Sequence, residues 1–302
     1  MKIDVIGFGA LNMDKIYRVP KIAKKGEETF VLDFQETPGG SSANTIVGLA
    51  RLGLKTGFIG KVADDNEGRF LLNDFKREGV NTDGIIVANE GRSGVVSAYV
   101  DKKGERALYV HPSVNDSLIF EEIKLEYAKR ARFLHLTSVD EKPFEAQKKL
   151  VEERSDVKVS LDPGEIYARK GLTKLKPLLE RSFLVLPSEG ELKILTKKGL
   201  KEGAKMLIKE GVGIVAVKLG ERGCYVTEGS ETYLIETFKV NVVDTLGAGD
   251  AFSAGFLYGL VKGKDLYECG RLGNFVASRC VTKVGARAGL PALLDIDILR
   301  KG

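Results

Sequence analysis

The sequence predicts an α/β fold with a mostly parallel sheet, and two observations support that prediction. Short apolar runs typical of buried strands alternate with amphipathic helical patterns along most of the 302 residues. Strands that alternate with helices favour parallel pairing, with helices covering both faces of the sheet. The composition, with 43% hydrophobic and 29% charged residues, is that of an ordinary globular chain. We therefore expect residues 1–302 to form a single domain.

The expected core elements follow one another along the chain. Each predicted helix carries apolar residues at helical spacing and is followed by a glycine that can cap its end in the left-handed conformation. Each predicted strand is a short, mostly apolar run. The predicted helices include 42–52 and 67–78, and the predicted strands are 3–9, 56–62, 133–136, 157–161, 183–186 and 213–218.

Two segments, approximately 15–36 and 93–111, break this alternation. The first contains Pro20 and a β-rich run over 29–34, and the second holds two alternating runs around a turn at 101–104. Antiparallel hairpin strands of this kind cannot join a parallel core as strand–helix–strand units. We expect the two segments to form together a small sheet outside the core.

Composition excludes several classes of function. There are only two histidines, His111 and His135, and three isolated cysteines, so zinc ligands at ordinary spacing are absent. The 47 basic residues are interspersed with 42 acidic ones and lack an aromatic stacking pattern, so no nucleic-acid partner is expected. No stretch approaches the roughly 20 apolar residues that span a bilayer, and the N-terminus lacks a signal-peptide pattern. We expect a cytoplasmic protein with reduced thiols and no membrane partner.

The strongest motif lies where a predicted β-run over 240–244 gives way to a helix after two glycines. Gly247, Ala248 and Gly249 carry little or no side chain, so their N–H groups can face an anion at the positive end of the helix dipole. Asp250 follows at once. A carboxylate beside a bound anion is unfavourable unless it acts on a third group, which indicates a base that takes a proton from a hydroxyl attacking phosphorus. The alternative is an acidic residue that merely complements the helix dipole.

The second motif is a pair of glycines before the helix that starts near residue 42. Two glycines allow the backbone to approach a ligand closely, and an amide side chain can both donate to and accept from hydroxyl groups. A carboxylate at the end of the first strand suits neighbouring hydroxyls, because it can accept from both. The predicted acceptor site consists of Asn12, Asp14, Gly39, Gly40 and Asn44. A serine N-cap at Ser41 or Ser42 would explain the glycine-rich start by the fold alone.

These two glycine motifs, in this order and over essentially the whole chain, resemble the ribokinase-type carbohydrate kinase family, often written PfkB. The resemblance implies a ribokinase-like three-layer α/β/α sandwich with a small β-sheet lid formed by the two segments at 15–36 and 93–111. It also implies an ATP-dependent phosphotransferase that moves the γ-phosphoryl group to a sugar hydroxyl, with Mg²⁺. In that family Asp250 corresponds to the catalytic base and Gly247–Gly249 to the anion hole.

The same resemblance implies further site residues. The turn that contains Lys218 corresponds to a nucleotide-contacting turn, although threonine is common at that position in the family. Where the family has Asn-x-x-Glu near magnesium and phosphate, this chain has Ser188 and Glu191, a pattern that is also a capping box. Glu191 would then act on magnesium through water. The implied nucleotide contacts are Ser188, Lys218, Gly220, Gly223 and Asn274, and Asp244 with Gly285 and Ala286 corresponds to a monovalent-cation site, for example for K⁺.

Several alternatives for the substrate stay open. The stretch 104–115 resembles the ribokinase pattern, which favours a pentose or a related free sugar as the acceptor. A nucleoside kinase is the first alternative, since aromatic residues of the lid could stack on a base, and a sugar-phosphate kinase that uses His111 or lid lysines is the second. A non-catalytic sugar- or nucleotide-sensing protein of the same fold is the alternative from another class. A homodimer through the lid is also an expectation, and the lid aromatics are Tyr17, Phe30, Phe34, Tyr99 and Tyr109.

Overall fold

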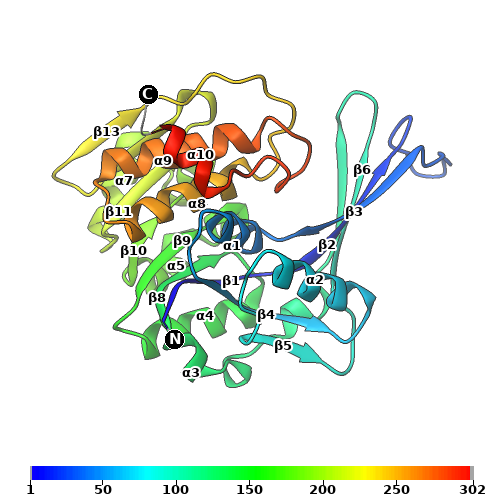
Figure 1. The fold of residues 1–302 in the computed structure, drawn as a ribbon, viewed down its shortest axis with the longest axis horizontal. Coiled ribbons are helices and arrows are strands. Elements are labelled where there is room, and N and C mark those ends of the chain that lie inside the picture. Colours follow the sequence, from blue (N-terminus) through cyan, green and yellow to red (C-terminus); the bar gives the residue numbers. More distant parts are fainter. Residues whose placement is uncertain (1, 300–302) are drawn as a thin grey trace.

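The computed structural model describes residues 2–299, and its core is one nine-stranded sheet (Figure 1). The strand order is β13-β12-β11-β10-β9-β8-β1-β4-β5. Pairing is parallel from β5 to β11, whereas β12 and β13 add an antiparallel edge. The strands are β1 (Ile3–Phe8), β4 (Thr56–Ala63), β5 (Ile85–Ala88), β8 (Ala131–Thr137), β9 (Lys158–Asp162), β10 (Ser182–Val185), β11 (Ile214–Lys218), β12 (Cys224–Thr227) and β13 (Thr232–Ile235).

Helices cover both faces of this sheet, and each face has its own apolar cluster. One face packs against α1 (Ser41–Arg51), α2 (Asn66–Arg77), α8 (Ala248–Val261), α9 (Leu266–Cys280) and α10 (Leu293–Leu299). The other packs against α3 (Leu125–Ala128), α4 (Glu141–Glu153), α5 (Gly164–Leu179), α6 (Glu189–Thr196) and α7 (Leu200–Lys209). The predicted three-layer α/β/α architecture is therefore confirmed. None of the helices within residues 2–299 is long and apolar enough to cross a membrane.

A second sheet projects from the core as the lid (Figure 1). Its strands are β2 (Asn12–Arg18), β3 (Asp33–Gly39), β6 (Gly94–Val100) and β7 (Arg106–His111), in the order β3-β2-β6-β7. Each predicted segment forms an antiparallel pair, but β2 and β6 join the two pairs in parallel. The predicted run over 29–34 was wrong in position, because β3 begins at Asp33. Gly39 pairs with Asn12, so β3 follows β2 to the end at which both meet the core.

The predicted β-run over 240–244 is also corrected, since that segment forms no strand. Val242 and Val243 are 62% and 58% exposed, so the apolar pattern there does not come from a buried strand. The N–H groups of Val243 and Asp244 instead donate to the carbonyl of Val281, at 2.8 and 3.2 Å. The segment leaves the sheet after β13 and runs beside the end of α9 before α8 begins.

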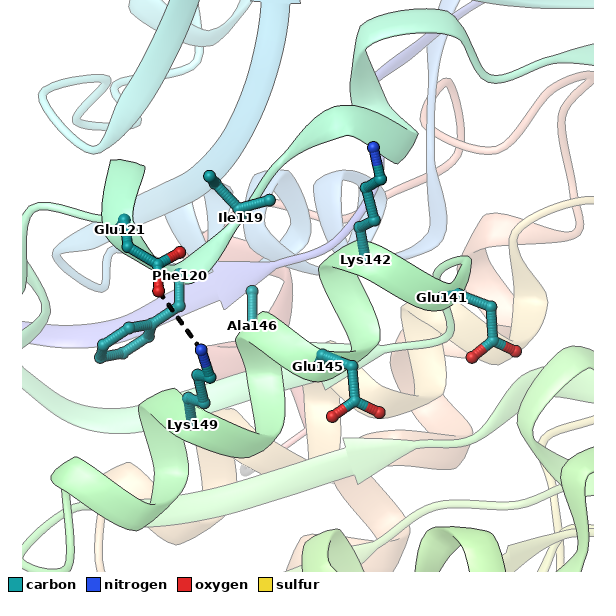
Figure 2. A pocket seen from close by; sticks show the side chains of 8 residues that line it. All are labelled: Ile119, Phe120, Glu121, Glu141, Lys142, Glu145, Ala146 and Lys149. Carbon is teal, nitrogen blue, oxygen red and sulfur yellow. Dashed lines mark hydrogen bonds and ion pairs between the residues drawn. The ribbon is translucent and has the colours of Figure 1, made fainter.

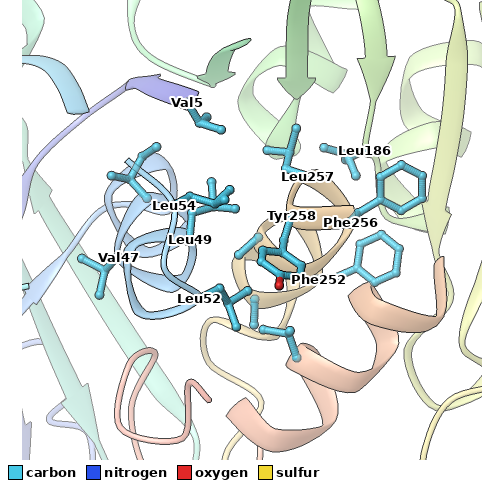
Figure 3. Packing of buried hydrophobic residues seen from close by; sticks show 14 of the residues in the cluster. Val5, Val47, Leu49, Leu52, Leu54, Leu186, Phe252, Phe256, Leu257 and Tyr258 are labelled. Atoms are coloured by element: carbon cyan, nitrogen blue, oxygen red, sulfur yellow. The ribbon is translucent and has the colours of Figure 1, made fainter. Parts of the chain in front are cut away.

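The packing of α1 on α8 brings the two glycine motifs together (Figure 3). The two helices are in close contact at Gly48 and Ala254, where an added Cβ on Gly48 would lie 2.9 Å from the Cβ of Ala254. One helical turn earlier on each helix lie Asn44 and Asp250, and these two side chains are hydrogen-bonded. Because Gly48 has no side chain, α1 can pack closely against α8, and this packing places the N-termini of the two helices side by side.

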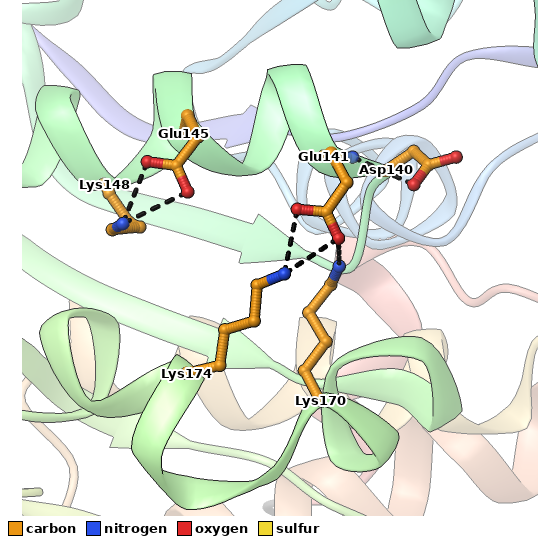
Figure 4. Close-up of polar contacts among 6 residues, drawn as sticks. All are labelled: Asp140, Glu141, Glu145, Lys148, Lys170 and Lys174. Carbon is orange, nitrogen blue, oxygen red and sulfur yellow. Dashed lines mark hydrogen bonds and ion pairs between the residues drawn. The ribbon is translucent and has the colours of Figure 1, made fainter.

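On the other face, ion pairs connect α4 and α5 (Figure 4). Glu141 accepts hydrogen bonds from Lys170 at 2.5 Å and from Lys174 at 3.0 Å. Glu141 is 57% exposed at its side chain, so these pairs contribute little stability. The buried side chain of Gln147 donates to the carbonyls of Phe8 and Thr137 and so holds the ends of β1 and β8 together.

Candidate active site

Asp250 lies where the first turns of α1 and α8 meet. Its Oδ1 accepts a hydrogen bond from Ser41 Oγ at 2.6 Å, and its Oδ2 accepts one from Asn44 Nδ2 at 2.9 Å. Thr45 Oγ1 donates to the carbonyl of Asp250 at 3.2 Å. The carboxylate of Asp250 is therefore held in a defined orientation by the helix that carries the predicted acceptor site.

The serines of α1 do not act as the predicted N-cap. Gly40 occupies the N-cap position with φ 106° and provides no side-chain cap. An added Cβ on Gly40 would lie 2.2 Å from the carbonyl oxygen of Ala10, so only glycine fits this approach. Because the backbone alone forms the turn, Ser41 is free to bind Asp250.

The start of α8 has the geometry of an anion-binding turn. Gly247 is the N-cap with φ 77°, and an added Cβ there would lie 2.6 Å from Ala286 Cα. At Gly249 an added Cβ would lie 3.3 Å from Nζ of Lys218, so a lysine ammonium lies beside the turn. The N–H of Ala248 already donates to Thr245 O at 3.2 Å, which makes the two glycine amides the stronger candidates for binding an anion.

The surroundings of Asp250 change its acidity. Burial raises the pKa of Asp250 from its usual value of 3.8 to about 6. The hydrogen bonds from Ser41 and Asn44 oppose this rise. The Asp162 carboxylate adds to it, and the Lys218 ammonium reduces it. A carboxylate with this pKa is ionised at neutral pH and is a stronger base than an exposed aspartate.

Asp14 lies on β2 at the junction of core and lid. An added Cβ on Gly39 would lie 2.1 Å from the Asp14 carboxylate, so this glycine makes room for the acid. Burial raises the pKa of Asp14 to about 6, the Arg287 charge opposes the rise, and the Asp250 charge adds to it. The negative charge of Asp250 therefore contributes to the raised pKa of Asp14. The structure brings both halves of the predicted acceptor site into one neighbourhood.

Asn12 is already engaged by its own hydrogen bonds. Its Oδ1 accepts from Asn115 Nδ2 at 2.8 Å, and Asn115 also binds the N–H and carbonyl of Leu11 at 3.2 Å each. Asn115 thus fixes the end of the strand that carries the acceptor residues. Gly94, which pairs with Asn12, leaves the room for this contact, since its Cβ would lie 2.1 Å from Asn115 Nδ2.

Four of the five aromatic residues predicted in the lid lie on the sheet face away from Asp14. Side chains alternate along a strand, so Tyr17 of β2 points opposite to Asp14. Tyr17 stacks on Phe34 and on Tyr99, with ring centroids 4.9 Å apart in both pairs, and Tyr99 meets Tyr109 edge-on at 5.9 Å. These four rings therefore contact one another within the sheet, although Phe34 and Tyr109 remain 46% and 66% exposed. The fifth aromatic residue, Phe30, is 85% exposed in the loop before β3.

A buried ion pair lies beneath the anion-binding turn. Lys218 Nζ donates to Asp162 Oδ2 at 2.6 Å, and the two side chains are only 14% and 6% exposed. Ser253 Oγ donates to the same oxygen at 3.0 Å. Asp162 ends β9 and Lys218 ends β11, so both side chains come from the carboxyl edge of the parallel sheet, where ligands bind in open α/β folds.

Three of the predicted nucleotide contacts, Gly220, Gly223 and Asn274, lie around the turn after β11 and the loop after β13. Asn274 is buried, and its Nδ2 donates to the carbonyls of Ile235 and Glu236 at 2.9 and 3.1 Å. An added Cβ on Gly223 would lie 1.9 Å from the carbonyl oxygen of Ile235. Gly220 opens the turn between β11 and β12 with φ 62°. Asn274 and Gly223 thus shape the loop after β13.

Ser188 and Glu191 form the capping box that the sequence suggests. Ser188 Oγ accepts from the N–H of Glu191 at 3.2 Å, and Glu191 Oε2 accepts from the N–H of Ser188 at 2.7 Å. Asp244 similarly accepts from the N–H of Gly285 through Oδ2 at 2.8 Å, which closes the loop predicted to bind a monovalent cation. Within residues 2–299 there is no cluster of three or more ligand-type side chains that could hold a metal ion by itself.

Three residues of this site were missed by sequence reasoning. Ser41 was seen only as a cap, although its position next to the glycine pair was a usable signal. Asp162 follows a predicted strand directly, which is the place for a ligand-side residue in a parallel sheet. Arg287 follows the Gly285–Ala286 pair without any motif of its own, and nothing local indicated its position.

A hollow of about 240 Å³ on the surface lies away from all of the predicted site residues (Figure 2). It is formed where the 3₁₀ turn η2 (Phe120–Glu122) meets α4, and Lys149 bridges it by a hydrogen bond to Glu121 at 3.2 Å. Of its charged side chains, Glu141 is paired with Lys170 and Glu145 with Lys148, both outside the lining. It has no base beside an anion-binding turn, so we do not consider it the active site.

A base placed between an anion-binding helix N-terminus and a hydroxyl-binding strand is an arrangement suited to phosphoryl transfer. Comparison with known proteins agrees: the sequence matches the pfkB family of carbohydrate kinases over residues 2–293. This chain belongs to that family.

Individual relatives cover most of the chain. A protein of Archaeoglobus fulgidus described as an uncharacterized sugar kinase is 48% identical over 253 residues, which cover 82% of this chain and 100% of that protein. The ribokinase of Bacillus subtilis is 30% identical over 301 residues, covering 96% and 97%. The structure of Arabidopsis thaliana ribokinase complexed with ribose and ATP matches with a TM-score of 0.89 at 25% identity, covering 100% of both chains. The predicted family, fold and enzyme class, a carbohydrate kinase, are thereby confirmed.

Proposed function

We propose that this protein transfers the γ-phosphoryl group of ATP to a hydroxyl of a free sugar of pentose size or a related free sugar. The observation that carries the proposal is the position of Asp250, which is bound by two side chains of the acceptor-side helix and follows the Gly247–Gly249 turn directly. The relative whose structure contains ribose and ATP supports the same pairing of substrates. Residues 1–302 act as one kinase domain in this proposal.

The roles of the residues follow from their places. Asp14 and Asn44 bind neighbouring hydroxyls of the sugar, and the backbone of Gly39 and Gly40 lets it approach. The acceptor hydroxyl displaces Ser41 from Asp250 Oδ1, and Asp250 then takes the proton of that hydroxyl as the oxygen attacks phosphorus. Amides of the Gly247–Gly249 turn stabilise the charge that develops on the phosphoryl oxygens.

A neutral acceptor suits the charge of this site. Asp14 and Asp250 place two carboxylates close together, and a third negative charge would be repelled. The lid face shared with Asp14 carries neutral side chains in the two nearest rows of pairs. These rows are Thr37, Val96 and Val110 beside Asp14, and Gln35, Ala98 and Leu108 beside Ile16.

The alternative substrates find less support in the structure. A sugar phosphate would need a cation, yet His111 and Lys15 lie on the opposite lid face, and Lys15 is bound to Glu67 at 2.8 Å. The Arg287 guanidinium, whose charge acts on Asp14, already donates to Asp74 and Asn44. A nucleoside would need an exposed ring on the Asp14 face, and the four packed aromatics are on the other. A non-catalytic sensor is disfavoured because Asp250 and the glycine turn are both intact.

The nucleotide would lie along Gly220, Gly223 and Asn274, with its phosphates towards Lys218. Magnesium bound to the phosphates would neutralise part of their charge. Ser188 and Glu191 fit it only indirectly, since the cap uses Oε2 of Glu191 and leaves Oε1 to a water of the hydrated ion. The Asp244–Gly285 loop would bind K⁺. A cytoplasmic location and a homodimer through the lid complete the proposal, and no nucleic acid or membrane takes part.

The experiment is a measurement of ADP release with a panel of free sugars, nucleosides and sugar phosphates, each with and without K⁺. A thermal-shift screen of the same compounds reports binding independently of turnover, because a ligand that binds the folded state raises its apparent stability. We expect a free sugar to be the best acceptor and Asp250→Asn to abolish most of its turnover. A panel in which only nucleosides or sugar phosphates react would replace the proposed acceptor. Binding without any ADP release would favour the sensor.

A further inference from the structure

Arg287 lies in the loop after α9 and is buried to 8% exposure. Its Nη1 donates to Asp74 Oδ2 of α2 at 2.7 Å, and its Nε donates to Asn44 Oδ1 at 2.7 Å. The carbonyl of Arg287 is itself held by Arg51 Nη1 at 2.6 Å, and Arg51 is paired with Glu78. Both the backbone and the guanidinium of Arg287 are therefore fixed.

The contact with Arg287 determines which way the Asn44 amide points. An arginine only donates, so the atom of Asn44 that faces Nε must be the oxygen. The other end, Nδ2, is then turned to Asp250, where it donates at 2.9 Å. If the amide rotated by half a turn, two donors would face each other at Arg287, and the Asn44 oxygen would face the Asp250 carboxylate.

One nitrogen of Arg287, Nη2, is buried and has no hydrogen-bond partner within the part of the chain that the structure describes. A buried charged donor without a partner costs free energy of folding. The buried position of Arg287 is therefore not explained by complete hydrogen bonding of its guanidinium. Its hydrogen bonds to Asn44 and Asp74 explain that position.

We propose that Arg287 is a positioning residue, which fixes the amide of Asn44 so that Asn44 donates to Asp250 and keeps the proposed base ionised and aligned. The proposal deepens the proposed function, since it assigns the residue that orients the base. Its physical content is a relay of four groups in contact: Asp74, Arg287, Asn44 and Asp250.

Other groups also act on Asp250, and the test must separate them from the relay. Lys218 from β11 lowers the pKa of Asp250, and Asp162 from β9 raises it. The Asp250 charge also raises the pKa of Asp14 on β2 and of Cys280 on α9. Arg287 itself lowers the pKa of Asp14, so acceptor binding must be measured as well as the acidity of the base.

The first measurement does not depend on activity. Protein labelled with ¹³C at aspartate carboxyls is titrated by NMR, and the Asp250 resonance is assigned with Asp250→Asn. In Arg287→Met the freed Asn44 amide no longer holds its donor on the carboxylate, so the Asp250 titration should move up by about half a pH unit or more. If Arg287→Met does not fold, Arg287→Lys keeps the charge but cannot reach both Asn44 and Asp74 in the same planar geometry, and a shift in the same direction is expected.

The second measurement is a double-mutant cycle on kcat and its pH profile. Arg287→Met alone should lower kcat below pH 7 and shift the acidic fall in kcat to higher pH, with the KM for ATP little changed. The KM for the sugar is measured in the same series, because Arg287 also lowers the pKa of Asp14. In the Asn44→Ala variant, adding Arg287→Met should change neither kcat nor its pH dependence any further. The Asn44 amide, through which Arg287 acts on Asp250, is already absent there. Arg154→Met removes another buried arginine, beside Asp156 at the end of α4, and should leave the profile where it is.

An unmoved Asp250 titration in Arg287→Met, or additive effects in the cycle, would overturn the proposal and leave Arg287 as a structural residue. A shifted titration in a protein that phosphorylates no sugar would instead refute the proposed function while the positioning role of Arg287 holds. The two failures are thus distinguishable.

Discussion

Asn44 and Asp250 lie 206 residues apart in the sequence and are joined by a hydrogen bond of 2.9 Å between Nδ2 and Oδ2. Asn44 belongs to the first glycine motif and Asp250 to the second. The contact exists because α1 and α8 pack along each other with Gly48 against Ala254. The acceptor site and the proposed base are consequently parts of one unit, and changes in either should be felt by the other.

Replacement of Asp250 by asparagine removes the proposed base with little change of shape. We expect turnover to fall roughly 10²–10⁴-fold while sugar and nucleotide still bind, because general base catalysis is lost and the contacts are kept. Steady-state kinetics with the best sugar of the panel measure this. Asp64→Asn, at an aspartate whose side chain is 63% exposed and whose partner Arg69 is also exposed, is the matched control and should be neutral. Turnover within about tenfold of wild type would refute the assignment.

The pH dependence of kcat/KM, which reports pKa values of the free enzyme, should show activity falling on the acid side near pH 6. The pKa of Asp250 is raised to about 6, and a base works only when ionised, so activity should fall as pH drops through this value. Asp14, with a pKa also raised to about 6, should increase the KM for the sugar over the same range. Circular dichroism at pH 5 checks that the protein remains folded. A fall near pH 4 would indicate an ordinary, solvated aspartate.

A larger side chain at Gly249 should impair phosphoryl transfer. An added Cβ would lie 3.3 Å from Lys218 Nζ, and the further methyl groups of Gly249→Val would crowd both the ammonium and the proposed phosphate position. Loss of one anion-hole donor raises the barrier by about 3–4 kcal/mol, which is roughly 10²–10³-fold in rate. Gly199→Val is the control, since no atom lies within 4 Å of an added Cβ there and its φ is -71°. A folded Gly249→Val with a normal rate would place the anion hole elsewhere.

Asp14→Ala separates the acceptor from the donor. Loss of charge-assisted hydrogen bonds to sugar hydroxyls should weaken acceptor binding by roughly 2–4 kcal/mol. The KM for ATP should barely change, because the proposed nucleotide contacts Gly220 and Asn274 come from the turn after β11 and from α9, whereas Asp14 is on β2. Lys15→Ala, at the next residue on the opposite lid face, is the control. Equal weakening of both substrates would mean that Asp14 supports the fold, and no weakening would mean that the hydroxyls bind to another strand.

Much of this protein could be predicted from local sequence. Alternation of apolar strands with amphipathic helices determines the parallel core, because periodicity reports which face of an element is buried. The glycine pairs at 39–40 and around 248 predicted tight turns before helices, since few other residues tolerate the positive φ values at Gly40 and Gly247. Asp14, Asn44 and Asp250 could be proposed for the same reason.

Only the tertiary structure decided how these parts are combined. The parallel pairing of β2 with β6 and the absence of a strand at 240–244 depend on which edges are free to pair, and no local pattern records this. The bonds of Ser41 and Asn44 to Asp250, and that of Arg287 to Asn44, join residues up to 243 positions apart. Such contacts arise from the packing of helices. The apolar face of each helix could be predicted from the sequence, but the rotation of one helix against another and the closeness of their packing could not. The sequence by itself therefore determined the elements and the chemistry they carry, and packing decided which polar groups meet.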